Sequence, residues 1–213
     1  MIKCCLTSTR INDLLMNNNA LTRSLLLFGD SILSNWYLLL QNNLDNWEVT
    51  NKAVSGETTS DLLHRLSTDL VGHSHDAVLI HVGINDIAGN SGEYFQDDTV
   101  ENLATIVKAA KQSHTHVLLS NLLPVTIIPW RECSNVYHSV LSLNDEIKNL
   151  AIREDVDFVD FFACLANDEG FMDKADAKDG VHPNKHSYCK MLSALSNMLE
   201  NMALDPSGKN RKN

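Results

Sequence analysis

Short apolar runs without alternation recur along this chain, and they restrict its fold more than any other feature. A strand that faces water on one side alternates apolar and polar residues, whereas a strand buried on both faces is apolar throughout. Stretches with apolar residues at helical spacing separate the runs. Strands that alternate with helices predict a parallel sheet with helices on both faces, because each crossover helix must pack against the sheet.

The predicted elements follow one another along most of the chain. The pattern predicts strands at residues 25–28, 47–54, 76–82, 116–120 and 156–161, and helices at residues 58–70, 98–113 and 139–154. A further helix follows Ser31, and the last one follows Pro183, which suits a first helical turn. The expected fold is therefore α/β, a three-layer α/β/α sandwich with a five-stranded parallel sheet.

The sequence contains no internal repeat and no linker that would divide this pattern. We expect residues 23–204 to form one domain. Residues 1–22 are polar and rich in asparagine, so we interpret them as a loosely attached leader. Residues 205–213 form a polar tail.

Composition excludes several classes of protein. The net charge of −10 argues against nucleic acid or an anionic membrane as the main partner. The five cysteines are odd in number and form no CxxC pair, so neither a disulfide framework nor a thiolate zinc site is expected. No signal peptide or membrane-spanning segment is recognised, and we expect a cytoplasmic protein; its oligomeric state does not follow from the sequence.

Ser31 lies between the first predicted strand and the helix that follows it. Open α/β sheets bind their ligands at the carboxyl ends of strands, and a helix start offers unpaired N–H groups with partial positive charge. Such a setting suits a nucleophile whose attack creates an oxyanion. Taken alone, the stretch also fits a serine that merely caps the helix.

Other candidate site residues are predicted to gather at the same edge of the sheet. Gly56 and Asn85 follow the second and third strands, whose carboxyl ends share this edge. Asp179 and His182 precede the last helix and are three residues apart, so one turn can bring the carboxylate to the imidazole. A serine nucleophile needs such a pair, because a base must take its proton and an acid must orient the base.

Together these blocks resemble the SGNH/GDSL hydrolase family (GDSL-like lipase/acylhydrolase) over about residues 25–200. The matching residues are Gly29-Asp30-Ser31 for its Gly-Asp-Ser block, Gly56 for its second block, Gly83 to Asp86 for Gly-x-Asn-Asp, and Asp179 with His182 for Asp-x-x-His. The resemblance implies a flavodoxin-like SGNH hydrolase fold. It also implies Ser31 as nucleophile, His182 as base and Asp179 as the acid that orients it, with an oxyanion hole formed by the Ser31 N–H, the Gly56 N–H and the Asn85 amide.

The expected function is a serine esterase or acylhydrolase that cleaves small carboxylic esters with short acyl groups, without metal or cofactor. The family also contains lysophospholipases and thioesterases, so these activities stay open on the same triad. Acyl transfer to an alcohol in place of water stays open as well, and so does a catalytically silent binding module on the same fold. The GxSxG motif of α/β-hydrolases is absent from the sequence.

Two histidine pairs raise the question of a metal site. His73 with His75, and His114 with His116, both precede strands and are expected in solvated turns at the opposite edge of the sheet from Ser31. No acidic or thiol partner has recognisable spacing to either pair. His81 lies in a buried strand and is expected to be a hydrogen-bonded core residue.

The remaining candidates have structural interpretations. Asp30 is expected to bind local backbone, and Asp86 to be structural. His186 falls within the last helix and lacks an aspartate three residues earlier. Trp130 and Arg131 lie on the loop at residues 124–137, where they either line the substrate site or pack on the surface.

Overall fold

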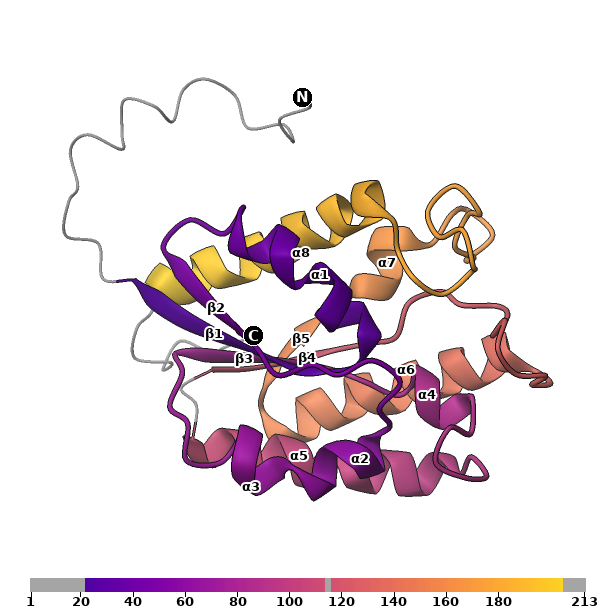
Figure 1. Ribbon diagram of the computed structural model, residues 1–213, viewed down its shortest axis with the longest axis horizontal. Coiled ribbons are helices and arrows are strands. Elements are labelled where there is room, and N and C mark those ends of the chain that lie inside the picture. Colours follow the sequence, from indigo (N-terminus) through magenta and orange to yellow (C-terminus); the bar gives the residue numbers. More distant parts are fainter. Residues whose placement is uncertain (1–21, 114–115, 205–213) are drawn as a thin grey trace.

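A computed structural model describes residues 22–113 and 116–204 of the chain (Figure 1). The predicted polar leader, apart from Thr22, and the predicted tail at residues 205–213 lie outside this part. So does His114 of the second histidine pair. Within the described residues no helix is both long enough and apolar enough to cross a membrane.

The core of the fold is a five-stranded, fully parallel sheet in the order β2-β1-β3-β4-β5. The central strands β1, β3 and β4 are apolar throughout much of their length because helices cover both of their faces. The edge strands β2 and β5 are only partly buried. The strand bounds are β1 Arg23–Gly29, β2 Trp47–Asn51, β3 Ala77–His81, β4 His116–Ser120 and β5 Asp157–Val159.

Two helix layers sandwich this sheet, as Figure 1 shows. Helices α1 (Ser31–Gln41), α7 (Phe161–Leu165) and α8 (Lys185–Leu204) cover one face. Helices α2 (Thr59–His64), α3 (Leu66–Asp69), α5 (Gln96–Ser113) and α6 (Val136–Glu154) cover the other, and the short α4 (Ile84–Ile87) contacts α6. The predicted three-layer α/β/α fold is therefore confirmed.

Some predicted strand boundaries are wrong. The second strand ends at Asn51, although the N–H groups of Lys52 and Val54 still donate to carbonyl oxygens of β1, those of Leu27 and Gly29. The fifth strand ends at Val159, because Asp160 accepts from the Ala163 N–H and begins α7.

The helices also differ from expectation: α5 begins at Gln96 rather than at residue 98, and α6 begins at Val136 rather than at residue 139. The helix predicted over residues 58–70 is broken at Arg65, whose guanidinium binds Glu57 and Asp69. The last helix begins at Lys185 rather than at Pro183. The Asn184 side chain accepts hydrogen bonds from the N–H groups of His186 and Ser187, so Asn184 is the cap and Pro183 precedes it.

Candidate active site

The strand order reverses next to β1, which has β2 on one side and β3 on the other. Open α/β sheets bind ligands in the crevice at such a reversal, outside the carboxyl ends of the strands. Ser31 follows β1 and Asn85 follows β3, so both lie at this crevice. Gly29 lets the two strands approach, since a Cβ at this position would lie 2.0 Å from the His81 carbonyl oxygen.

Ser31 is the first residue of α1, and Asp30 is its cap. The Asp30 Oδ1 accepts a hydrogen bond of 2.9 Å from the Ile32 N–H. The interpretation in which Ser31 itself caps the helix is therefore wrong, and the Ser31 hydroxyl is left for another partner. As the first helical residue, Ser31 also has a backbone N–H without an intrahelical acceptor.

Ser31, His182 and Asp179 form one hydrogen-bonded chain. The Ser31 Oγ lies 2.9 Å from the His182 Nε2, and the His182 Nδ1 lies 2.7 Å from the Asp179 Oδ2. An ionised Asp179 can only accept, so Nδ1 carries a proton and a neutral His182 presents the Nε2 lone pair to the serine hydroxyl. The arrangement matches a nucleophile, a base and an acid that orients the base.

Asp179 is held in place by the turn before α8. Its Oδ1 accepts hydrogen bonds from the N–H groups of Val181 (3.0 Å) and His182 (2.8 Å). Partial burial opposes ionisation, but the hydrogen bonds from the His182 ring and from the two backbone N–H groups outweigh it and lower the pKa of Asp179. Asp179 is therefore a fixed anion beside the imidazole, as an orienting acid must be.

Gly56 lies in the loop that follows β2, and Asn85 lies in the short helix α4 that follows β3. Gly56 has φ +85°, which favours glycine, and a Cβ there would meet no atom within 4 Å, so the space next to it is open. Asn85 is buried, and its Nδ2 donates 2.9 Å to the Glu57 carbonyl oxygen, which leaves a second N–H on the same nitrogen. Both groups can supply donors to a developing oxyanion.

Comparison with known proteins agrees with this geometry. The family model for the GDSL-like lipase/acylhydrolase family matches residues 27–188, which include every predicted site residue. This chain belongs to that family. The expected family and a carboxylic ester hydrolase are thus confirmed at the level of the family.

Individual relatives support the assignment. Esterase TesA of Pseudomonas aeruginosa is 29% identical over 205 residues, which cover 88% of this chain and 90% of that protein. The structure of a GDSL-like lipase from Bacteroides thetaiotaomicron has a TM-score of 0.77 at 26% identity, covering 89% of this chain and 94% of that one. A variant of the acetyl xylan esterase Axe2 from Geobacillus stearothermophilus shares the fold, with a TM-score of 0.68 at 21% identity over 82% of this chain and 93% of that one.

The two other aspartates near the crevice of this GDSL-family protein are structural, as expected. Asp86 accepts hydrogen bonds from the Thr59 N–H and hydroxyl and so ties the start of α2 to α4. Asp30 is fully buried, and its Oδ2 has no hydrogen-bond partner in the described part of the chain. Burial, with the nearby charges of Asp86 and Glu57, raises the pKa of Asp30 to about 7.

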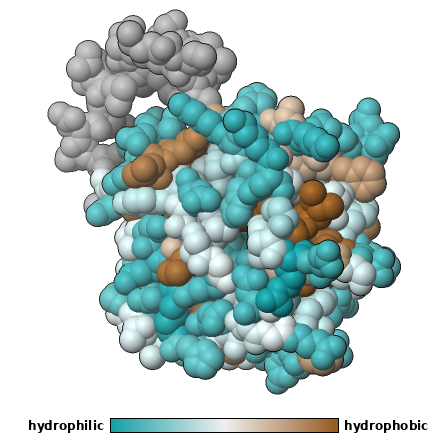
Figure 2. Space-filling model, turned by 45° about the vertical axis from the view of Figure 1, so that its right-hand side comes forward, coloured by the Kyte–Doolittle hydropathy of each residue, from teal (hydrophilic) through white to brown (hydrophobic). Residues whose placement is uncertain are grey.

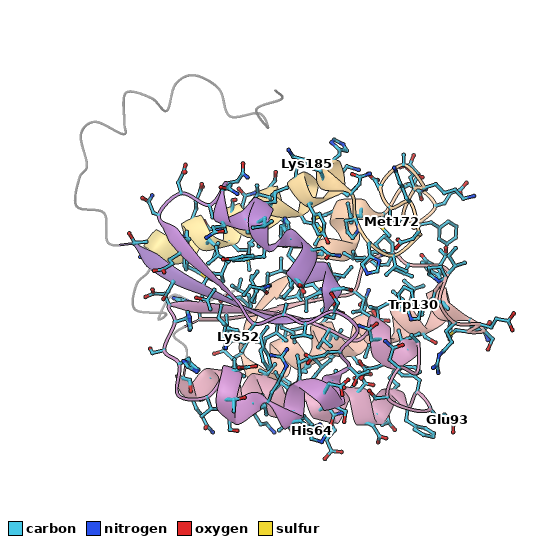
Figure 3. All side chains as sticks on the ribbon, in the orientation of Figure 1. Lys52, His64, Glu93, Trp130, Met172 and Lys185 are labelled. Atoms are coloured by element: carbon cyan, nitrogen blue, oxygen red, sulfur yellow. The ribbon has the colours of Figure 1, made fainter. Side chains whose placement is uncertain are left out.

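Trp130, on the loop between β4 and α6, contacts the site through His182. Its ring lies beside the His182 imidazole, with centroids 5.9 Å apart and planes inclined by 33°. Figure 3 shows Trp130 beyond the carboxyl ends of the strands, between the two helix layers. Trp130 is 43% exposed, and Ile127 on the same loop is 57% exposed. Figure 2 turns this side of the molecule forward and shows a group of apolar residues at its right, with hydrophilic residues around it.

The other candidate histidines have surroundings of their own. His81 is buried and its Nδ1 lies 2.8 Å from the Ser120 hydroxyl, as predicted for a core residue. His116 is not in a solvated turn, because it is buried as the first residue of β4. His73 lies near the Thr68 carbonyl oxygen, and His186 is exposed on α8. Among the described residues, no group of three or more His, Cys, Asp and Glu side chains could hold a metal ion.

Asn90 is the site residue that the sequence did not indicate. Its side chain contacts Gly56, Asn85 and Trp130, which come from three different segments. A polar residue in a loop rich in glycine and serine carries no local signal of such contacts. Only the packing of the three loops brings its partners together.

Proposed function

We propose that this protein is a serine esterase that hydrolyses carboxylic esters through an acyl-enzyme on Ser31. The single observation that carries the proposal is the hydrogen-bonded chain from the Ser31 hydroxyl through His182 to Asp179. Ser31 begins α1, whereas Asp179 and His182 lie in the turn before α8, far from Ser31 in the sequence but next to it in the fold. Family membership supports ester cleavage, and the geometry supports these residues as its agents.

The proposed reaction has two halves. In the first, the Ser31 Oγ attacks the ester carbonyl carbon while its proton passes to the His182 Nε2. The tetrahedral intermediate then expels the alcohol, which takes that proton from His182. In the second half, water gives a proton to His182 and attacks the acyl-enzyme, and the acid leaves as Ser31 recovers its proton. Asp179 stabilises the imidazolium that forms in each half.

The carbonyl oxygen becomes negative in both halves, and three donors are proposed to stabilise it. They are the Ser31 N–H at the start of α1, the Gly56 N–H and the second N–H of the Asn85 amide. The helix start adds a partial positive charge. The burial of Asn85 supports this role, because a donor in a site of low polarity stabilises charge more strongly than it does in water.

The acyl group is proposed to be short. A small apolar hollow of about 10 Å³ lies beneath the site, which is about the space of one water molecule. Three of its lining residues adjoin site residues in the sequence: Ile32 follows Ser31, Ile84 precedes Asn85 and Val181 precedes His182. The others are His81, Leu122, Leu123 and Val125. An acetyl methyl group suits this space, whereas a long chain would need the hollow to open.

The alcohol part of the ester is proposed to lie against Trp130. His182 must deliver its proton to the leaving oxygen, so that oxygen lies on the His182 side of Ser31. The Trp130 ring borders His182 there and offers an apolar face. Water also reaches this side, since 42% of the Asp179 side chain is exposed. That access favours hydrolysis over transfer to another alcohol.

Ser31→Ala tests the proposal directly. We expect kcat for p-nitrophenyl acetate to fall by at least about 10⁴-fold with the fold intact, as in other serine triads. Ser34→Ala, one turn further along α1, is the matched control and should keep wild-type kcat. Turnover by Ser31→Ala within tenfold of wild type would remove Ser31 from the mechanism.

A further inference from the structure

We infer that Asn90 is the positioning residue of the oxyanion hole, and that it links this hole to Trp130. The inference rests on the proposed function and adds a residue to it. Asn90 lies five residues after Asn85, beyond the end of α4. Among the described residues, its side chain is the one group that bonds to Gly56, to Asn85 of α4 and also to Trp130.

The hydrogen bonds of Asn90 can be assigned without ambiguity. The Glu57 carbonyl can only accept, so the Asn85 Nδ2 must face it, and the Asn85 Oδ1 must face Asn90. The Trp130 Nε1 can only donate, so the Asn90 Oδ1 must face Trp130 at 3.3 Å. The Asn90 Nδ2 then donates to the Asn85 Oδ1 at 3.1 Å and to the Gly56 carbonyl oxygen at 3.0 Å. If either amide were flipped, donors would face donors and acceptors would face acceptors at both its oxygen and its nitrogen.

This network determines the direction of the Asn85 amide. The Asn85 Oδ1 is held by Asn90 and one of its N–H groups by Glu57, so the plane of the amide is fixed from two sides. The second N–H then has a single direction, as a preorganised oxyanion donor requires. The hydrogen bond from Asn90 to the Gly56 carbonyl oxygen fixes the position of the Gly56 loop relative to Asn85.

The chain places Asn90 by a sharp turn. Gly89 has φ +66°, and a Cβ there would lie 2.8 Å from the Gly92 carbonyl oxygen, so only glycine fits. The Asn90 backbone N–H donates to the Asn85 carbonyl at 3.0 Å, and the Arg131 Nη1 donates to the Gly89 carbonyl at 2.8 Å. Trp130 and Arg131 therefore both brace the segment that carries Asn90.

The test is a double-mutant cycle between Asn90 and Asn85, with kcat and KM for p-nitrophenyl acetate as readouts. We expect Asn90→Ala to lower kcat by about 10- to 100-fold with KM changed less than threefold, because the donor is misaligned only where charge develops. In the Asn85→Ala background the fold-loss in kcat caused by Asn90→Ala should be at most one third of its fold-loss in the wild-type background. Equal losses in both backgrounds, or a rise in KM alone, would overturn the inference.

Two further variants and a control complete the design. Asn90→Asp still accepts from Trp130 but, when ionised, cannot donate, so it should lose at least as much kcat as Asn90→Ala; wild-type kcat in Asn90→Asp would also overturn the inference. Trp130→Phe keeps the ring but loses the N–H, and we expect it to lower kcat two- to fivefold in the wild type and not in Asn90→Ala. Asn42→Ala removes an exposed asparagine that bonds to a backbone carbonyl on α1, and should change neither constant.

The two proposals fail separately. An inactive Ser31→Ala together with a fully active Asn90→Ala would overturn the role of Asn90 alone. An active Ser31→Ala would remove the proposed nucleophile and with it the oxyanion hole that Asn90 is inferred to position. Thermal unfolding of each variant distinguishes lost alignment from lost fold, and Asn90→Asp replaces Asn90→Ala in the cycle if the latter does not fold.

Discussion

Asp30 and Ser31 are adjacent and have opposite surroundings. Asp30 is buried in the core and binds the backbone of its own helix, whereas the Ser31 hydroxyl faces His182 at the crevice. Capping by Asp30 frees Ser31 from that role. Burial raises the pKa of Asp30 to about 7, so the stability of the fold depends on pH through this carboxyl group.

We expect Asp30 to make the protein less stable as pH rises. Its pKa is higher in the folded state than its ordinary value of 3.8, so the folded state binds the proton more tightly and loses stability as pH rises from about 4 through 7. Between pH 5.5 and 8.5 this amounts to about 2 kcal/mol. Asn at this position stays neutral and still accepts from Ile32, so Asp30→Asn should remove that part of the pH dependence of the unfolding free energy.

Urea unfolding at both pH values measures this effect. Asp168→Asn, on an exposed loop, is the control and should leave the wild-type pH dependence unchanged. A variant Asp30→Asn whose unfolding free energy falls as much as that of the wild type over this interval would show that Asp30 ionises normally in the folded protein.

Asn85→Ala should show the signature of a lost oxyanion donor. We expect kcat to fall by about 10²–10³-fold with a smaller change in KM, because the amide is proposed to act only as negative charge develops. Steady-state kinetics with p-nitrophenyl acetate measure both constants. A rise in KM with kcat unchanged would assign Asn85 to ground-state binding instead.

The contact between β1 and β3 sets the crevice, and Gly29 permits it. Gly29→Ala would place a Cβ 2.0 Å from the His81 carbonyl oxygen, so the strands must separate. We expect a loss of more than about 3 kcal/mol in unfolding free energy, since overpacking against backbone cannot relax through a side chain. Gly72→Ala is the control, because its φ of +87° is strained but no atom lies within 4 Å of its Cβ.

Gly72→Ala should lose only about 1–2 kcal/mol, the cost of a left-handed backbone conformation. Urea unfolding measures the unfolding free energy of both variants under the same conditions. Equal losses for Gly29→Ala and Gly72→Ala would mean that β1 and β3 can move apart freely, and that the geometry of the crevice does not depend on Gly29.

The central strands were predictable from the sequence because burial on both faces leaves a local pattern of unbroken apolar residues. The site residues that follow β1 and β3 were predictable for a related reason, since parallel strands bring their carboxyl ends to one edge. The helix break at Arg65 and the short helices α4 and α7 were not predictable. Helix α7 begins at the side-chain cap of Asp160, and hydrophobic periodicity does not record such a hydrogen bond.

The same limit applies to the site. Asn90 and its contacts depend on how three loops pack, so no spacing in the sequence could indicate them. The role of Trp130 stayed open between the substrate site and surface packing for this reason. Its position beside His182 emerges only from the packed fold.

The hollow next to the site is small, about 10 Å³, and its lining comes from several strands and loops of the fold. We expect kcat/KM for p-nitrophenyl esters to be highest for acetate and to fall through butyrate and octanoate. Val125→Ala widens one wall of the hollow and should raise the ratio of butyrate to acetate activity several-fold, since each buried methylene contributes about 0.8 kcal/mol.

Val117→Ala controls for general loosening of the core, because Val117 is buried on β4 but does not line the hollow. Its butyrate-to-acetate ratio should equal that of the wild type. A wild-type kcat/KM that rises steadily through decanoate, with the esters kept monomeric, would show a deep acyl site and contradict the proposed preference.

Covalent labelling with a fluorophosphonate tests the central claim most directly, namely that Ser31 is a nucleophile activated by His182 and Asp179. Intact mass and peptide mapping should find one adduct, on Ser31, in the wild type and in Ser34→Ala. Ser31→Ala should not react, and His182→Ala should react at least about 10²-fold more slowly, because its serine has lost the base. An unlabelled wild-type protein, or an adduct on another residue that persists in Ser31→Ala, would contradict the account.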